Sequence, residues 1–146
     1  MSYVNEELRK IVASRAHNLC EYFLIHEEDT YSGCQVDHVI SIKHGGSTIA
    51  DNLACAFCNQ HKGTDLGSVL TTTGELVRFF NPRHDHWADH FKLDGVVIKP
   101  LTHIGEVTVN ILDFNNAECL AEREVLSLLG LYPPQAALAL IAGRKD

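Results

Sequence analysis

The sequence has no apolar run long enough to cross a membrane, because no stretch approaches the roughly 18 uncharged apolar residues that a span needs. Its first residues, Met1 to Glu7, also lack a basic stretch followed by an apolar one, so we expect no signal peptide. These two absences lead us to expect a cytoplasmic protein with no membrane partner.

Positive charge is also scarce, with 12 Lys and Arg against 19 Asp and Glu and a net charge of −7. Proteins that coat nucleic acid without sequence preference are usually basic, since phosphate neutralisation supplies most of that binding. The balance argues against a general DNA-coating protein, but it allows an enzyme with a local phosphate-facing site. Residues 35–63 are locally neutral, because Lys43 and Lys62 balance Asp37 and Asp51.

Cysteine is sparse and odd in number, with five residues in the chain. In a reducing compartment such cysteines favour metal ligands or buried thiols over a disulfide framework.

The 146 residues, of which 45% are hydrophobic, suit one domain with a packed core, or one domain with a helical appendage. Apolar residues at helical spacing predict a helix over 5–19, which Ser2 or Asn5 would cap. The β-branched stretch 35–41 predicts a short strand. Residues 51–62 predict a strand or turn that enters a short helix, with Gly63 at its end.

The second half of the chain predicts further strands and helices. Residues 73–80 suggest a turn and a strand, and Asp94-Gly95 is a strong hairpin signal between 87–93 and 96–101. Residues 102–112 predict a helix, and a capping box at 115–118 opens a helix through Leu129. Residues 135–142 form an apolar segment.

Several chemically active side chains fall close together in the sequence. Cys55 and Cys58 have the two-residue spacing that lets two thiolates reach one zinc ion. This pair alone is a weak signal, as is the adjacent pair Asp37-His38. Their order and spacing, with Cys20 before them and Asn52 between them, make the pattern specific.

The pattern resembles the HNH endonuclease family, and it consists of Asp37-His38-Val39-Ile40, Gly45-Gly46-Ser47, Asn52-Leu53 and Cys55-x-x-Cys58-Asn59-x-x-Lys62-Gly63. The resemblance implies an α+β fold with a ββα-metal core. We expect this core at residues 1–66, together with an N-terminal helix and the loop that begins at Cys20, which we call the knuckle. We expect a β-hairpin and C-terminal helices at residues 67–146, packed on the core. Asn81-Pro82-Arg83 and Trp87-x-x-His90-Phe91 also resemble a tail found on one bacterial branch of the family.

The resemblance further implies a metal-dependent endonuclease that hydrolyses DNA phosphodiester bonds. A neutral imidazole suits the removal of a proton from water, and oxygen ligands suit Mg²⁺ or Mn²⁺. The implied roles are general base for His38, ligands of the divalent cation for Asp37 and Asn59, support of the base for Asn52, and nucleic-acid contacts for His61 and Lys62.

A structural zinc ion is a separate expectation with two alternatives. Family members with this zinc hold it by two C-x-x-C pairs, but the first pair here reads Cys20-Glu21-Tyr22-Phe23. Zinc would then be held by Cys20, Cys55 and Cys58, with Cys34, His26 or water as the fourth ligand. Alternatively, Phe23 packs where zinc would lie and the knuckle is metal-free.

Other functions also remain open from the sequence. The acidic charge and the broken cysteine pair favour a catalytically inactive HNH-fold module that binds nucleic acid or protein. A zinc-only structural or redox protein would leave Asp37-His38 unexplained. We also expect Trp87 and its neighbouring Phe residues in a core, His84, His86 and His90 near a strand without a second metal, and a candidate homo-oligomer contact at Leu126 to Ile141.

Overall fold

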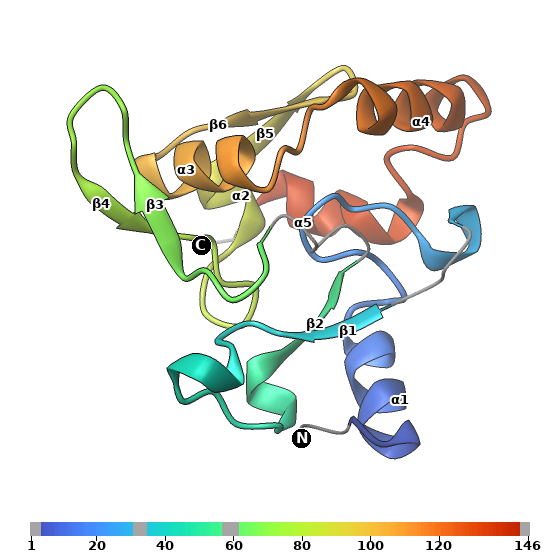
Figure 1. Ribbon diagram of the computed structural model, residues 1–146. Coiled ribbons are helices and arrows are strands. Elements are labelled where there is room, and N and C mark those ends of the chain that lie inside the picture. Colours follow the sequence, from blue (N-terminus) through green and yellow to red (C-terminus); the bar gives the residue numbers. More distant parts are fainter. Residues whose placement is uncertain (1–3, 31–34, 57–61, 144–146) are drawn as a thin grey trace.

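The computed structural model describes residues 4–30, 35–56 and 62–143. Helix α1 and the strand pair β1–β2 form one end of the molecule, and the remaining elements form the other (Figure 1). The bounds are α1 Glu6–Arg15, β1 Gln35–His38, β2 Leu53–Ala56, β3 Gly67–Val69, β4 Leu76–Arg78, α2 Trp87–His90, β5 Phe91–Asp94, β6 Val97–Pro100, α3 His103–Ile111, α4 Ala117–Leu128 and α5 Leu138–Ala142.

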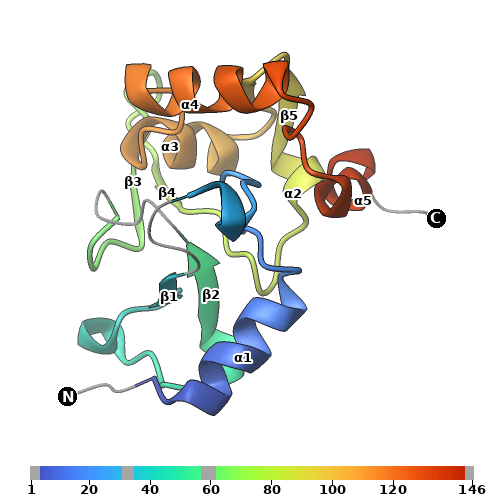
Figure 2. The ribbon, with the colours of Figure 1, turned by 90° about the vertical axis from the view of Figure 1, so that its right-hand side faces the viewer.

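Helix α1 begins where the sequence predicts it, because the side chain of Asn5 accepts a hydrogen bond from the Leu8 N–H at 2.8 Å. It ends at Arg15, before the expected end at residue 19, because His17 and Asn18 adopt positive φ angles of 54° and 59°. Its buried residue Val12 packs on the strand pair in a small cluster with Leu53 and Cys55. Figure 2 shows α1 lying along β2.

The strands β1 and β2 are antiparallel, with Asp37 opposite Ala54 and His38 opposite Leu53. The expected strand over 35–41 ends at His38, since the chain then turns into the loop that leads to β2. This loop includes the 3-10 turns Ile42–His44 and Ala50–Asn52. The hairpin therefore presents Asp37 and His38 at the point where β1 meets the loop.

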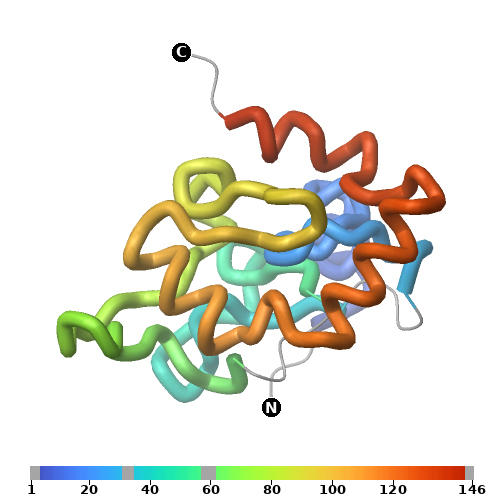
Figure 3. The backbone as a smooth tube through the Cα atoms, turned by 90° about the horizontal axis from the view of Figure 1, so that it is seen from above, coloured from blue at the N-terminus to red at the C-terminus, as the bar shows by residue number. Residues whose placement is uncertain are grey.

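Over the described residues, the other end of the molecule is built on two hairpins and four helices, α2 to α5. The predicted hairpin at Asp94-Gly95 is confirmed as β5–β6, and the two predicted helices are confirmed as α3 and α4. Seen from above, β5–β6 lies between the α3–α4 pair and α5 (Figure 3). Strand β3 was not expected. The expected hairpin arm over 87–93 begins as a strand only at Phe91, because residues 87–90 form the short helix α2, and His90 lies directly before β5, near a strand as expected.

The main hydrophobic core joins the two ends of the molecule. It contains the apolar residues of the knuckle segment 19–25 and Ala56 of β2, together with buried residues between Leu70 and Ala137. Trp87, Phe79, Phe80 and Phe91 are all buried in it, which confirms their expected core position. The α+β class is confirmed, and no described helix has the length and apolar character of a membrane span.

Candidate nuclease site

Asp37 and His38 lie side by side at the end of β1, and both are half-buried. The Asp37 carboxylate oxygen Oδ1 accepts a hydrogen bond from the His38 backbone N–H at 2.9 Å. The imidazole Nε2 lies 2.9 Å from the Thr48 hydroxyl oxygen. When Nε2–H donates to this hydroxyl, the lone pair of Nδ1 is available to accept a proton.

Asn52 ties the two ends of the loop together. Its Oδ1 accepts the Ile40 N–H at 2.9 Å, and its Nδ2 donates to the carbonyls of Ile40 and Ser47 at 2.9 and 3.0 Å. Gly46 lies against the same bonds, since a Cβ there would be 1.7 Å from the Ile40 carbonyl oxygen. The loop that carries Thr48 to His38 therefore depends on the amide of Asn52 and on a glycine at 46.

Lys62 lies behind His38 rather than on the surface. Its side chain is in a residue only 2% exposed, and its Nζ donates to the His38 carbonyl at 3.3 Å. Burial lowers the pKa of Lys62, an effect that the charges of Asp37 and Asp65 partly oppose. This position does not fit the expected contact with nucleic acid, because a buried ammonium bonded to backbone cannot meet a phosphate in solvent.

The described residues supply only part of the expected ligand set of the catalytic divalent cation. Asp37 supplies a carboxylate, and Mg²⁺ is often held by one or two protein oxygens with water and phosphate. Asn59, the other expected ligand, lies outside the described residues, as do His61 and Cys58. Over the described parts of the chain, no group of three or more His, Cys, Asp or Glu side chains could hold a metal ion.

Backbone hydrogen bonds hold the knuckle around Cys20 and join it to Cys55 of β2. The Glu21 N–H donates to the Cys55 carbonyl at 2.8 Å, and the Phe23 N–H lies 3.3 Å from the Cys20 sulfur. Cys20 is buried and is not in a disulfide, whereas Cys55 is disulfide-bonded and Cys119 is not its partner. Cys58, which the expected zinc site also needs, lies outside the described residues, so the zinc alternative stays a prediction.

Phe23 occupies the position of the missing fourth cysteine and faces the C-terminal half of the chain. Its ring packs edge-on against Phe114, with the centroids 4.8 Å apart, and lies 5.9 Å from the guanidinium carbon of Arg123. The backbone beside it is also held, because Trp87 donates to the Tyr22 carbonyl and Tyr132 to the Phe23 carbonyl. These contacts favour the metal-free knuckle.

Arg123 was not recognised from the sequence as a buried residue. It has no exposed surface and donates to the Val96 and Phe114 carbonyls and to the Asn115 side chain, at 2.7 to 2.9 Å. Burial lowers its pKa. The sequence around Arg123 did not indicate that the side chain is buried. Its acceptors are the carbonyl of Val96, which is distant in sequence, and two groups in the loop that precedes α4.

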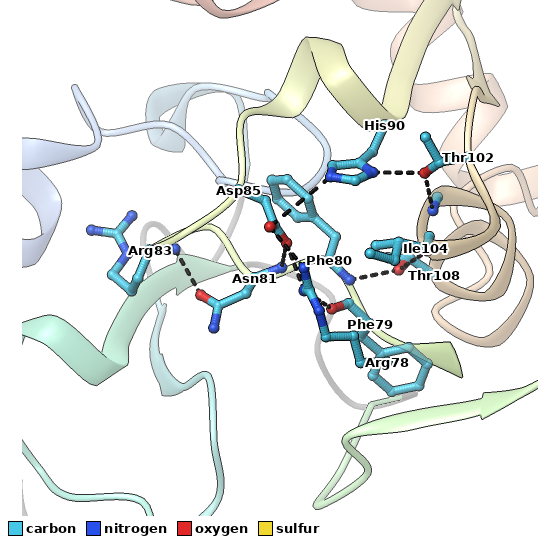
Figure 4. A network of polar contacts seen from close by, with 11 residues as sticks. Arg78, Phe79, Phe80, Asn81, Arg83, Asp85, His90, Thr102, Ile104 and Thr108 are labelled. Carbon is cyan, nitrogen blue, oxygen red and sulfur yellow. Dashed lines mark hydrogen bonds and ion pairs between the residues drawn. The ribbon is translucent and has the colours of Figure 1, made fainter. Parts of the chain in front are cut away.

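Hydrogen bonds and an ion pair form a polar network in the loop that follows β4 (Figure 4). Asp85 accepts two hydrogen bonds from Arg78 at 2.7 and 2.9 Å and one from the Asn81 N–H at 2.8 Å. The Asn81 side chain accepts the Arg83 N–H at 2.8 Å. The Asn81-Pro82-Arg83 segment is thereby held in one conformation, with Arg83 beside the knuckle residue Glu21 as its ion-pair partner.

Residues 20–65 match the sequence profile of the HNH endonuclease family. The matched segment contains the knuckle, β1, the Asn52 loop and β2, so the expected resemblance is confirmed for this part of the chain and indicates a nuclease-type function. The expected likeness of residues 81–91 to a family tail lies outside the match and stays a prediction. No curated protein and no solved structure matches the chain.

Proposed function

We propose that the protein is a metal-dependent endonuclease that hydrolyses DNA phosphodiester bonds. The observation that carries this proposal is the pairing of Asp37 and His38 at the end of β1, inside the segment that matches the HNH family. A carboxylate for a cation and an imidazole for a proton, on adjacent residues, are the two groups that this hydrolysis needs.

In this proposal His38 is the general base. Its imidazole is half-buried beside the loop and is oriented by the Thr48 hydroxyl. It takes the proton of a water molecule as that water attacks the phosphorus atom of the scissile phosphate. A base positioned in this way contributes about 10²–10⁴-fold to a rate.

Asp37 and Asn59 are the proposed ligands of a Mg²⁺ or Mn²⁺ ion. When bound, such an ion stabilises the charge that develops on the phosphate and on the leaving 3′ oxygen. The His38 N–H holds Asp37 Oδ1 at 2.9 Å, which fixes the carboxylate beside the base.

Asn52 and Lys62 are positioning residues in this proposal. Asn52 closes the loop that brings Thr48 to His38. Lys62 holds the backbone carbonyl of His38 from the interior. Neither side chain touches the substrate, so their loss would lower activity through the orientation of His38.

The test is the nicking of supercoiled plasmid with Mg²⁺ or Mn²⁺, compared between the wild type, His38→Ala and His44→Ala. His44 is an exposed histidine on the same loop and serves as the matched control. We expect His38→Ala to lose nicking by about 10²–10⁴-fold with an unchanged melting temperature, and His44→Ala to retain it. Equal cleavage by His38→Ala would contradict the assigned role.

The rival function, an inactive HNH-fold binding module, gives a different result in the same experiment. It predicts that the wild-type protein retards DNA in a gel without nicking it in any divalent metal. The net charge of −7 favours weak, salt-sensitive DNA binding in either case, so cleavage is the result that separates the two functions.

A further inference from the structure

A cavity of about 320 Å³ lies between the end of α1 and the loop after β4. Basic and imidazole side chains gather in its wall, namely Arg15, His17, Arg83, His84 and His86. None of these residues belongs to the site at Asp37 and His38.

Arg83 is the most buried cation of this cavity. Its side chain is 10% exposed and forms an ion pair with Glu21, while its Nε atom is buried without a hydrogen-bond partner. Burial and the charge of Arg15 lower the pKa of Arg83 to about 10. Two guanidinium groups therefore lie close enough to repel each other, and one donor of Arg83 is left over.

Of the two arginines in the cavity wall, Arg15 has the positive charge that nearby carboxylates neutralise less. Its Nη2 donates to the Leu53 carbonyl at 2.8 Å, and across the described residues it has no carboxylate within ion-pair distance. Asp51 acts on it only at longer range. Leu53 is opposite His38 in the strand pair, so the guanidinium adjoins the hairpin that carries the proposed base.

The two carboxylates in the cavity wall are already engaged. Glu21 uses one oxygen for Arg83 and the other for the Cys55 N–H at 2.9 Å. Asp85 is held by Arg78 from outside the cavity. The cavity thus has donors and positive charge in excess of acceptors, which is the arrangement that binds an anion.

The wall that presents Arg83 is also held before any ligand arrives. The bonds from Asn81 and Asp85 fix the backbone of its loop (Figure 4), and the Glu21 carboxylate fixes its guanidinium. Guanidinium groups match the geometry of phosphate oxygens. A pre-organised site loses less free energy on binding.

We propose that this cavity is a phosphate subsite that binds a backbone phosphate of nucleic acid away from the scissile bond. The identity of the ligand as nucleic acid rests on the proposed nuclease function, whereas the affinity for phosphate rests on Arg15 and Arg83 alone. Arg15 supplies charge at the hairpin, and Arg83 supplies oriented donors.

The cavity contains its own spectroscopic probe, since Trp87 lies in its wall and is the one tryptophan of the chain. The experiment is a titration of the full chain with inorganic phosphate, in EDTA and at constant ionic strength, followed by tryptophan fluorescence. We compare the wild type with Arg15→Gln and Arg15→Lys. The matched control is Arg9→Gln, which changes an exposed arginine on the same helix.

We expect a saturable change in emission for the wild type and for Arg9→Gln. Arg15→Gln is expected to bind at least about tenfold more weakly, as the loss of one charge-assisted hydrogen bond predicts, and Arg15→Lys is expected to recover part of the affinity. A wild type without a saturable change, or an Arg15→Gln that titrates like the wild type with an unchanged melting temperature, would overturn the subsite.

A second arm identifies the source of the phosphate. A short DNA duplex added in EDTA is expected to displace inorganic phosphate, and in the nicking assay Arg15→Gln is expected to raise KM with little change in kcat. Phosphate binding without displacement by DNA would overturn the nucleic-acid assignment. If phosphate and DNA bind but no metal supports nicking, the subsite stands and the proposed nuclease function fails.

Discussion

The replacement of Phe23 by alanine tests whether packing, rather than zinc, holds the knuckle. The ring is in a residue 2% exposed and meets Phe114 at 4.8 Å. Phe→Ala changes in well-packed cores cost about 3–5 kcal/mol. For a chain of this size each kcal/mol lowers the melting temperature by about 2–4 °C, so we expect a decrease of roughly 10 °C.

The same position allows a direct comparison with the zinc alternative. Phe23→Cys supplies the missing fourth thiol, but it also removes the ring from Phe114 and Arg123. If packing holds the knuckle, Phe23→Cys is destabilised nearly as much as Phe23→Ala, and added zinc does not restore its melting temperature. If packing holds the knuckle, EDTA should also leave the melting temperature of the wild type unchanged.

The assay is thermal unfolding followed by circular dichroism, with and without EDTA or zinc. Leu76→Ala is the control, because Leu76 is 76% exposed and its truncation should change the free energy of unfolding by less than about 0.5 kcal/mol. A Phe23→Ala protein within about 1 kcal/mol of the wild type would refute the packing argument. Strong stabilisation of Phe23→Cys by zinc would refute it as well.

Three further predictions concern other parts of the molecule. Gly46→Ala should abolish plasmid nicking and lower the melting temperature, because its Cβ would meet the Ile40 carbonyl at 1.7 Å. Burial raises the pKa of Asp85, but its hydrogen bonds with Arg78 and the backbone outweigh this and lower it. Asp85→Asn should therefore be less stable than the wild type at neutral pH, in urea unfolding, and this difference should shrink as pH falls through and below about 3.9. Exposed apolar residues at the end of α4 should support self-association, and Leu128→Lys should shift the sedimentation coefficient toward the monomer; an unchanged value would contradict this contact.

Local chemistry made several elements predictable from the sequence. Asn5 caps α1 and Asn116 caps α4, each by accepting an N–H three residues ahead. Gly95 takes a positive φ of 62° in the turn of β5–β6. Each signal acts within a few residues, so a single sequence contains it. The early end of α1 was missed because neither His17 nor Asn18 has the strong preference of glycine for positive φ.

The candidate site was predictable in its residue types but not in its contacts. Asp37, His38 and Asn52 were identified by their spacing, and the structure describes how the loop bonds join them. Lys62 was expected at a phosphate because it is charged and close in sequence to the motif. Its burial depends on the packing of segments 24 residues apart, which no local pattern contains.

Phe23 stands where a fourth cysteine was expected, and the C-terminal extension packs against it. A small HNH core needs something to hold its knuckle, and zinc commonly does this in small domains. Here Trp87 and Tyr132 bond the backbone of Tyr22 and Phe23, and the Phe23 ring enters the core of the extension. Without these contacts, the knuckle would expose the apolar surface that it now buries. We infer that residues 1–66 and 67–146 fold as one unit, in which the contacts of Tyr22 and Phe23 with the extension help to hold the knuckle.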